Sequence, residues 1–474
     1  METKNKELLP IRYEDRITGK GSYFAMWLGI AVIIATFSLG GEGVQQIKLG
    51  WVALACFLAN VLVGFIMTLT GDVGVEHGIT FPVYMRAPFG MKGAALPILC
   101  RAVLGCIWFG IQSYYGATAM NYIINYLTGF NNWYVCFLIF TAAQVINTAM
   151  GLKAIERFAN FAAPCIAIIS IWMFYRLSIQ AQGAGIDIWN TVLAPGQGSI
   201  NTATVSLHVF FLVFCTNISY WSTTTADSQT LARTTKAPKN EKNWFARNAI
   251  AMCGHMLALP ITQTFCIVIG GVAMLVAGNW NPIEALQQTA SGGALLVLLL
   301  LIILAQWSTN ISANMMLPAV SFHNTFPKLL TYRKAVILVG LISVLSFPWE
   351  IMARIGGFLN AMSAIYAPIA GISVVDYYLF RKRRLNVPEL YKEKGQFYGE
   401  GGWNLSGVIS MAAGFAASLL IAKYAYLVGF FTGGIVYYIL NKVWWMKVHK
   451  QAEIEENFDE KYLGLSVGHE WEIS

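Results

Sequence analysis

Trp108 and Gln112 lie four positions apart in an apolar run that includes the stretch CIWFGIQ. In a helix this spacing places both side chains on one face. An indole offers a flat π surface, and a primary amide offers two donors and an acceptor. The pair therefore suits a flat ring with a polar edge. The same pattern is typical of a Trp that packs on a neighbouring helix and a Gln that bonds across to it, so the spacing alone leaves both interpretations open.

A second polar stretch occupies residues 215–225, with the sequence CTNISYWSTTT. It holds an Asn and six Ser or Thr residues, which are poor helix formers because their side chains compete for backbone groups. One interpretation is a break in the helix near Asn217–Ser219. The alternative is an unbroken helix whose hydroxyl groups bond back to its own carbonyls.

A third polar stretch, AQWSTNISAN, occupies residues 305–314. Ala305, Ser308 and Ser312 share one side at helical spacing, and Thr309 lies next to them. Hydroxyl and carbonyl oxygens are hard ligands, so this side suits a weakly held alkali cation. A packing seam of small residues is the alternative interpretation.

Glycines interrupt the first apolar run in two places. Gly29 would allow an unwound turn in its middle, and Gly40-Gly41-Glu42-Gly43 is typical of a helix end. Interrupted helices at matching positions of two halves indicate a transporter site at the membrane midplane. The first and sixth runs would begin two such halves, although the halves do not align by eye.

The composition requires lipid around most of this chain. Of 474 residues, 56% are hydrophobic and 12% are charged, whereas soluble proteins carry about 25% charged residues. The net charge of +8 lies mainly between apolar runs, where it orients helices and faces anionic lipid headgroups. Nucleic acid is therefore not expected as a partner, and no obligate protein partner is evident.

Runs of about 20 apolar residues are long enough to span a bilayer as helices. The sequence predicts an all-α integral membrane fold with twelve spans, at about 23–43, 49–71, 95–126, 133–152, 157–177, 204–225, 247–279, 294–321, 334–350, 355–381, 403–422 and 425–446.

The basic residues predict the orientation of these spans. With the N-terminus inside, 27 of the 32 Lys and Arg residues fall in cytoplasmic segments, and only Lys48, Arg354 and Lys423 fall outside. A wrong number of spans would destroy this bias. We therefore expect a multi-pass protein of a plasma membrane (the inner membrane in a bacterium), with a cytoplasmic tail at 1–22, one transporter domain at 23–446 and a second cytoplasmic tail at 447–474.

The sequence carries no motif of an enzyme. The six His residues are scattered, and no HExxH, GxSxG or P-loop pattern occurs. Transport would thus be driven by a gradient. Asp227 and Asp376 lie near predicted cytoplasmic helix ends, where a carboxylate can be solvated, and we expect a structural or gating role for them rather than proton relay. A sensor without transport would need an output domain, and both tails are too short for one.

Several motifs, in order, resemble those of one known family. They are GITFPV at 78–83, RAPFG at 86–90, WFGIQ at 108–112, the stretch from Trp307 to Asn314, and DYYL at 376–379 followed by Arg381. Over about residues 10–445 the chain resembles nucleobase–cation symporter family 1, which includes hydantoin, allantoin, uracil and cytosine permeases. It is most similar to the bacterial hydantoin-permease-like branch.

The resemblance implies a leucine-transporter-type fold with two inverted five-helix repeats, at about 23–177 and 204–381, and two extra helices at 403–446. It also implies that Trp108 and Trp221 enclose a planar ring and that Gln112 and Asn314 bond its edge. It further implies a sodium site, whose ligands would be the carbonyls of Gly29, Val32 and Ala305 and the hydroxyls of Ser308 and Thr309.

Two positions depart from the family pattern and affect the expected substrate. Ile33 stands where a ring-binding amide is frequent, and Tyr220 stands where some relatives have glycine. With no Arg or Lys near the site, we expect a neutral heterocycle: a nucleobase, a hydantoin, allantoin or a related cyclic amide. Sodium is the expected coupling ion, with a proton as the alternative. A transporter of the same fold for an amino acid or amine is the other alternative.

Overall fold

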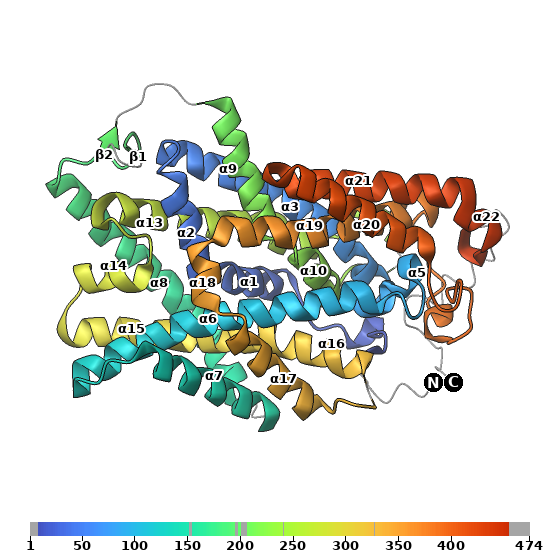
Figure 1. The fold of residues 1–474 in the computed structure, drawn as a ribbon, viewed down its shortest axis with the longest axis horizontal. Helices are drawn as coiled ribbons and strands as arrows, with labels where there is room; N and C mark the ends of the chain where they lie inside the picture. The colour runs from blue at the N-terminus through green and yellow to red at the C-terminus, as the bar shows by residue number, and fades with distance from the viewer. Residues whose placement is uncertain are drawn as a thin grey trace.

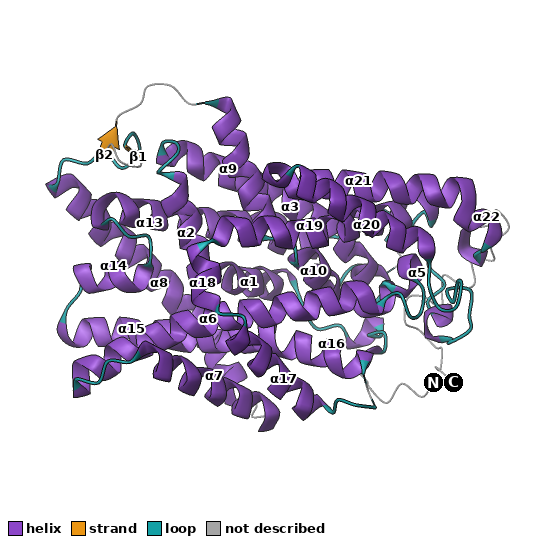
Figure 2. Cartoon of the chain, in the orientation of Figure 1, coloured by secondary structure: helices purple, strands orange, loops and turns teal. Residues whose placement is uncertain are grey.

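The computed structural model describes residues 8–150, 154–194, 198–200, 206–239, 241–326 and 328–454. Helices make up nearly all of the described structure, as Figure 2 shows. The one small sheet pairs β1 (Val192–Ala194) with β2 (Gly198–Ile200) in antiparallel register. The chain is thus an all-α protein, as predicted.

The long helices coincide with the predicted spans and run along the longest axis of the molecule (Figure 1). The first five spans are α1 (Lys20–Ala31) with α2 (Ile34–Gly43), α3 (Leu49–His77), α6 (Ala95–Thr128), α7 (Trp133–Met150) and α8 (Ala154–Gly183). Two short helices, α4 (Phe81–Tyr84) and α5 (Arg86–Phe89), connect α3 to α6.

The next five spans follow the same order along the chain. The sixth span consists of α9 (Leu207–Tyr220) and α10 (Thr224–Ala232), and the seventh of α11 (Trp244–Arg247), α12 (Ala249–Met252), the π-helical turn η3 (Cys253–Ala258) and α13 (Leu259–Ala277). The eighth consists of α15 (Gly292–Asn310), η4 (Ile311–Met316) and α16 (Leu317–Thr325). The ninth consists of α17 (Tyr332–Leu345) and α18 (Pro348–Ala353), and the tenth of α19 (Ile355–Val374) and η5 (Val375–Phe380). The short helix α14 (Pro282–Thr289) precedes α15.

The last two spans are α20 (Leu405–Leu420) and α21 (Ala425–Leu440), the latter extended by η8 (Asn441–Trp445) and α22 (Met446–Val448). Short 3-10 turns are η2 (Tyr13–Asp15), η6 (Pro388–Tyr391), η7 (Ala422–Tyr424) and η9 (Ala452–Ile454). Within the described residues, six helices are each long and apolar enough to cross a membrane, and α1 with α2 forms a seventh span that bends by 63°.

The break in the first span lies at Val32 and Ile33, not at Gly29. Gly29 stays helical inside α1, and the backbone leaves the helical region at Val32 (φ −85°, ψ 83°) and Ile33 (φ −119°, ψ 136°). Two buried rings of α1 pack tightly on η3, where a Cβ at Gly254 would overlap Trp27 and Tyr23. That packing supports α1 up to its last turn, whereas the β-branched residues after it are poorer helix formers.

The sixth span also breaks later than predicted, at Trp221–Thr223. The Thr216 hydroxyl donates to the Leu212 carbonyl and the Asn217 amide donates to the Val213 carbonyl, so these residues stay inside α9. The alternative of back-bonding side chains thus holds for the first part of the stretch, and the helix breaks only after Tyr220.

Close backbone contact joins α2 to α13. A Cβ at Gly40 would overlap the carbonyl oxygen of Ile267, and a Cβ at Gly270 would overlap the carbonyl oxygen of Phe37. Only glycine permits such an approach. The second half of the first span therefore lies directly on α13, backbone against backbone.

Both ends of the described chain pack on the segment between η5 and α20. The Tyr391 hydroxyl donates to the Leu8 carbonyl, and Gln396 bonds Glu453. Glu453 is fully buried against Arg381. The C-terminal segment is therefore part of the core at this end, although a buried acid there was not expected from the sequence.

Candidate substrate cavity

One cavity lies where the two broken spans meet α6 and η4. It has about 500 Å³ of empty space, part of which is open to solvent. All six residues that the sequence analysis assigned to substrate binding line it. The lining is Ile30, Ile33, Arg101, Trp108, Gln112, Tyr220, Trp221, Thr223, Thr224, Asp227, Thr309, Ala313 and Asn314.

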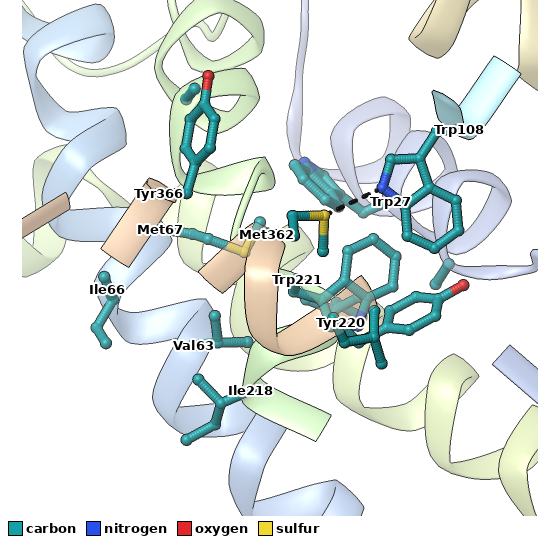
Figure 3. Packing of buried hydrophobic residues seen from close by; sticks show 14 of the residues in the cluster. Trp27, Val63, Ile66, Met67, Trp108, Ile218, Tyr220, Trp221, Met362 and Tyr366 are labelled. Atoms are coloured by element: carbon teal, nitrogen blue, oxygen red, sulfur yellow. Dashed lines mark hydrogen bonds between the residues drawn. The ribbon is translucent and has the colours of Figure 1, made fainter. Parts of the chain in front are cut away.

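Three aromatic residues of the cavity lining, Trp108, Tyr220 and Trp221, lie close together (Figure 3). Tyr220 contacts both indoles edge to face, with ring centroids 5.4 Å from Trp108 and 5.2 Å from Trp221. Phe358 meets Trp108 from another direction at 5.7 Å. A planar ligand between the two indoles would share this space with Tyr220.

Each of these rings is held by a different neighbouring helix. The Trp108 indole N–H points at the sulfur of Met362 on α19, at 3.3 Å (Figure 3). The Trp221 indole N–H donates to Oε1 of Gln263 on α13. The Thr36 hydroxyl on α2 donates to the Tyr220 oxygen at 3.2 Å. Sequence reasoning missed Gln263 and Met362, since neither lies in a polar stretch.

Two amides supply the polar edge of the cavity. Gln112 is 2% exposed, and its buried Oε1 has no hydrogen-bond partner among the described residues. Asn314 is 5% exposed and donates from Nδ2 to Oδ1 of Asn310, at 3.2 Å. An unpaired buried oxygen costs free energy until a ligand or water donates to it, so this edge is suited to a ligand with N–H groups.

An ion pair that was not expected from the sequence also lines the cavity. Arg101 on α6 bonds Asp227 on α10 through two contacts, Nε to Oδ1 at 2.9 Å and Nη2 to Oδ2 at 2.7 Å. The expectation that no Arg lies near this site is therefore wrong, and Asp227 is paired rather than solvated. An Arg inside a predicted span was the available signal, because such residues almost always pair.

The predicted cation ligands are only partly described. Gly29 lies in the last turn of α1, whose carbonyls have no partner within the helix, and Val32 lies at the break itself. Thr309 lines the cavity described above, whereas the side chains of Ala305 and Ser308 lie outside the described residues. Carbonyl oxygens at a helix C-terminus favour a cation, so this part of the structure is suited to one. Among the described residues, no group of three or more His, Cys, Asp or Glu side chains is placed to hold a metal ion.

A cavity beside two broken membrane-spanning helices is typical of a transporter. Residues 10–441 match the model of the family described as permeases for cytosine and purines, uracil, thiamine and allantoin. The chain belongs to this family, whose members carry small heterocyclic compounds and are transporters rather than enzymes.

Curated relatives match over nearly their whole length. The hydantoin permease of Microbacterium maritypicum is 28% identical over 467 residues, which cover 97% of this chain and 93% of that protein. The allantoin permease of Bacillus subtilis is 24% identical, with coverage of 95% and 94%.

Solved structures of one transporter, Mhp1, match equally completely. The inward-facing conformation of Mhp1 superimposes with a TM-score of 0.86 at 26% identity and covers 97% of both chains. Its closed conformation with bromovinylhydantoin bound gives 0.82 at 26% identity, with coverage of 97% and 99%. These matches confirm the predicted family and the predicted leucine-transporter-type membrane fold.

Proposed function

We propose that this chain is a secondary symporter that imports a neutral, planar nitrogen heterocycle together with sodium. The observation that carries the proposal is the single cavity in which two indoles and two amides meet beside the broken first and sixth spans. Aromatic faces hold a flat ring, and the amides of Gln112 and Asn314 bond its edge. The substrate class is a nucleobase, a hydantoin, allantoin or a related cyclic amide.

The charges around the cavity support a neutral substrate. Arg101 and Asp227 compensate each other through two short contacts, so the pair adds no net charge to the lining. A carboxylate or phosphate ligand would have to displace Asp227 from Arg101. The expectation of a neutral ring thus stands, although for a different reason from the one that the sequence offered.

Alternating access is the mechanism that the broken helices support. α10 carries Asp227, and the continuous helix α6 carries Arg101 and two of the predicted ring-binding residues, Trp108 and Gln112. Movement of the broken helices against α6 would open the cavity first to one side and then to the other.

Sodium is proposed as the coupling ion because α1 ends beside the cavity, and the carbonyl oxygens of a last helical turn have no partner within the helix. Coupling is reciprocal, so sodium and ring would each strengthen binding of the other. Proton coupling and transport of an amino acid or amine remain the alternatives. We further propose the inner membrane of a bacterial cell as the location, with both tails cytoplasmic and the domain at 23–446.

Tryptophan fluorescence of the purified protein tests the proposal. Uracil, cytosine, adenine, allantoin, hydantoin, benzyl-hydantoin and several amino acids would be titrated with and without sodium. We expect saturable quenching by at least one ring, with tighter binding in sodium and loss of binding in Trp108→Ala and Trp221→Ala.

Other outcomes decide between the alternatives. Quenching by amino acids only would overturn the substrate class. Ring binding that ignores sodium but responds to pH would keep the substrate class and replace sodium by a proton.

A further inference from the structure

Behind Asn314, buried polar side chains from three helices form a continuous chain of hydrogen bonds. Nδ2 of Asn310, at the end of α15, has two N–H groups and three acceptors within hydrogen-bond distance: the Phe109 carbonyl (3.0 Å), Oγ of Ser113 (3.1 Å) and Oε1 of Gln144 (3.3 Å). Gln144, on α7, donates from Nε2 to Oγ of Ser113 at 3.0 Å. Asn310, Ser113 and Gln144 are all fully buried, so water does not compete for these bonds.

The Phe109 carbonyl fixes the direction of the whole chain. A backbone carbonyl only accepts hydrogen bonds, so the Asn310 atom that faces it is the nitrogen. Oδ1 of Asn310 then faces Asn314, and the Asn314 atom 3.2 Å away is the donor Nδ2. Because neighbouring bonds settle the orientation of an amide, Oδ1 is the end of Asn314 that remains for the cavity.

Gln112 has no comparable anchor. Its Oε1 is buried without a hydrogen-bond partner among the described residues, and no neighbour dictates which end of its amide faces the cavity. The polar edge therefore combines one amide of fixed orientation with one that can turn to suit a ligand.

We infer that Asn310, supported by Gln144, is a positioning residue that holds Asn314 as a hydrogen-bond acceptor toward the substrate. The transported ring must then bring an N–H group to this point, which selects cyclic amides and imides with a free N–H and rejects fully N-alkylated rings. This inference rests on the proposed function, since it concerns the ring that the cavity binds.

Two pairs of probes test the inference: hydantoin with 1,3-dimethylhydantoin, and uracil with 1,3-dimethyluracil. The dimethyl rings keep the carbonyl acceptors and lose the N–H donors. In the wild-type protein we expect the dimethyl ring of the responding pair to bind about 10- to 100-fold more weakly, the penalty for one unpaired buried acceptor. Dissociation constants come from quenching of tryptophan fluorescence.

Asn310→Leu separates the role of orientation from the bulk of the methyl groups, which is the same in every variant. Without Asn310, Asn314 can turn its NH₂ to a ring carbonyl, so the ratio of the two dissociation constants should fall at least about fivefold. Ser113→Ala should keep the ratio, because the Phe109 carbonyl still anchors Asn310. Asn217→Leu is the matched control, since the amide of Asn217 donates only within its own helix.

Each outcome counts for or against the inference. Equal binding of both members of a pair to the wild type, or an unchanged ratio in Asn310→Leu, would overturn it. If Asn310→Leu does not fold, Gln144→Leu should give a smaller fall in the same ratio, and no fall would count against the inference. If neither hydantoin nor uracil binds the wild type, the comparison uses another ring that binds and its N-alkylated form, and failure of every heterocycle in the panel would contradict the proposed function itself.

Discussion

Two buried arginine–carboxylate pairs use the same chemistry in different surroundings. Arg381 bonds Asp376 at 2.7 and 3.2 Å, and it also bonds Glu453 and Gln451. Asp376 accepts further hydrogen bonds from two tyrosines, Tyr84 at 2.9 Å and Tyr437 at 2.8 Å. The Arg381 and Asp376 side chains are both 0% exposed. This pair fastens α4, η5, α21 and the C-terminal segment into one unit.

The pair at the cavity is less completely satisfied. Arg101 and Asp227 have side chains 7% and 14% exposed, and Nη1 of Arg101 has no hydrogen-bond partner among the described residues. The pair joins only α6 and α10, the two elements that would separate in transport. The two pairs thus differ mainly in their additional hydrogen-bond partners. We expect the well-supported pair at Arg381 to stay closed and the less supported pair at Arg101 to open during transport.

The largest expected effect is that of Asp376→Ala. It leaves Arg381 buried without its main counter-charge, so the protein should lose about 3–5 kcal/mol of stability. Thermal unfolding in detergent measures the loss. Glu393→Ala, at an exposed position between η6 and α20, is the control and should unfold with the wild type. If Asp376→Ala and the control variant unfold at the same temperature, the Arg381–Asp376 pair does not stabilise the protein as expected.

Tyr437→Phe sharpens the same point with a smaller change. It removes one O–H donor to the Asp376 carboxylate and keeps the ring, so the expected loss is about 1.5–3 kcal/mol, as for a hydrogen bond to a charged group. Tyr438→Phe, on the adjacent and more exposed position, should be close to neutral in the same unfolding assay. A neutral Tyr437→Phe would show that the extra partners do not stabilise the pair.

Asp227→Ala should cost less stability, about 1–2 kcal/mol, but should slow uptake of the ring at least about tenfold, because an uncompensated Arg101 then lines the cavity. Uptake into proteoliposomes and thermal unfolding measure the two effects separately. The double variant Arg101→Leu/Asp227→Ala should recover the stability. A double variant less stable than Asp227→Ala would contradict the interpretation.

The smallest effect is expected for an exposed pair. His449 and Glu400 approach to 3.6 Å, with side chains 24% and 53% exposed. Glu400→Gln should change stability by no more than about 0.5 kcal/mol. A loss as large as that of Tyr437→Phe would mean that burial does not rank these pairs.

The sequence was sufficient to predict the spans and the residues of the cavity wall. Helical spacing put Trp108 and Gln112 on one face, and the polar stretches marked the regions of Trp221 and Asn314. All of them line one cavity, although their binding roles stay predictions. These features depend on residues that are neighbours in the sequence, so periodicity and composition are sufficient to predict them.

Contacts between distant elements could not be predicted in the same way. Arg101 and Asp227 lie 126 residues apart, and nothing in either stretch names the other. The breaks were displaced for a related reason: packing of α1 on η3 keeps Gly29 helical, and back-bonding within α9 keeps Asn217 helical. Tertiary packing overrides the preference of a single residue.

The glycine contacts between α2 and α13 determine how movement would pass through the molecule. Because the two backbones touch at Gly40 and Gly270, a movement of α2 toward α13 would be passed directly to α13. Gln263 lies on α13 and accepts a hydrogen bond from the indole N–H of Trp221. A movement at the break after α1, where the cation ligands are predicted, would therefore be transmitted through α2 and α13 to Trp221 in the lining of the cavity.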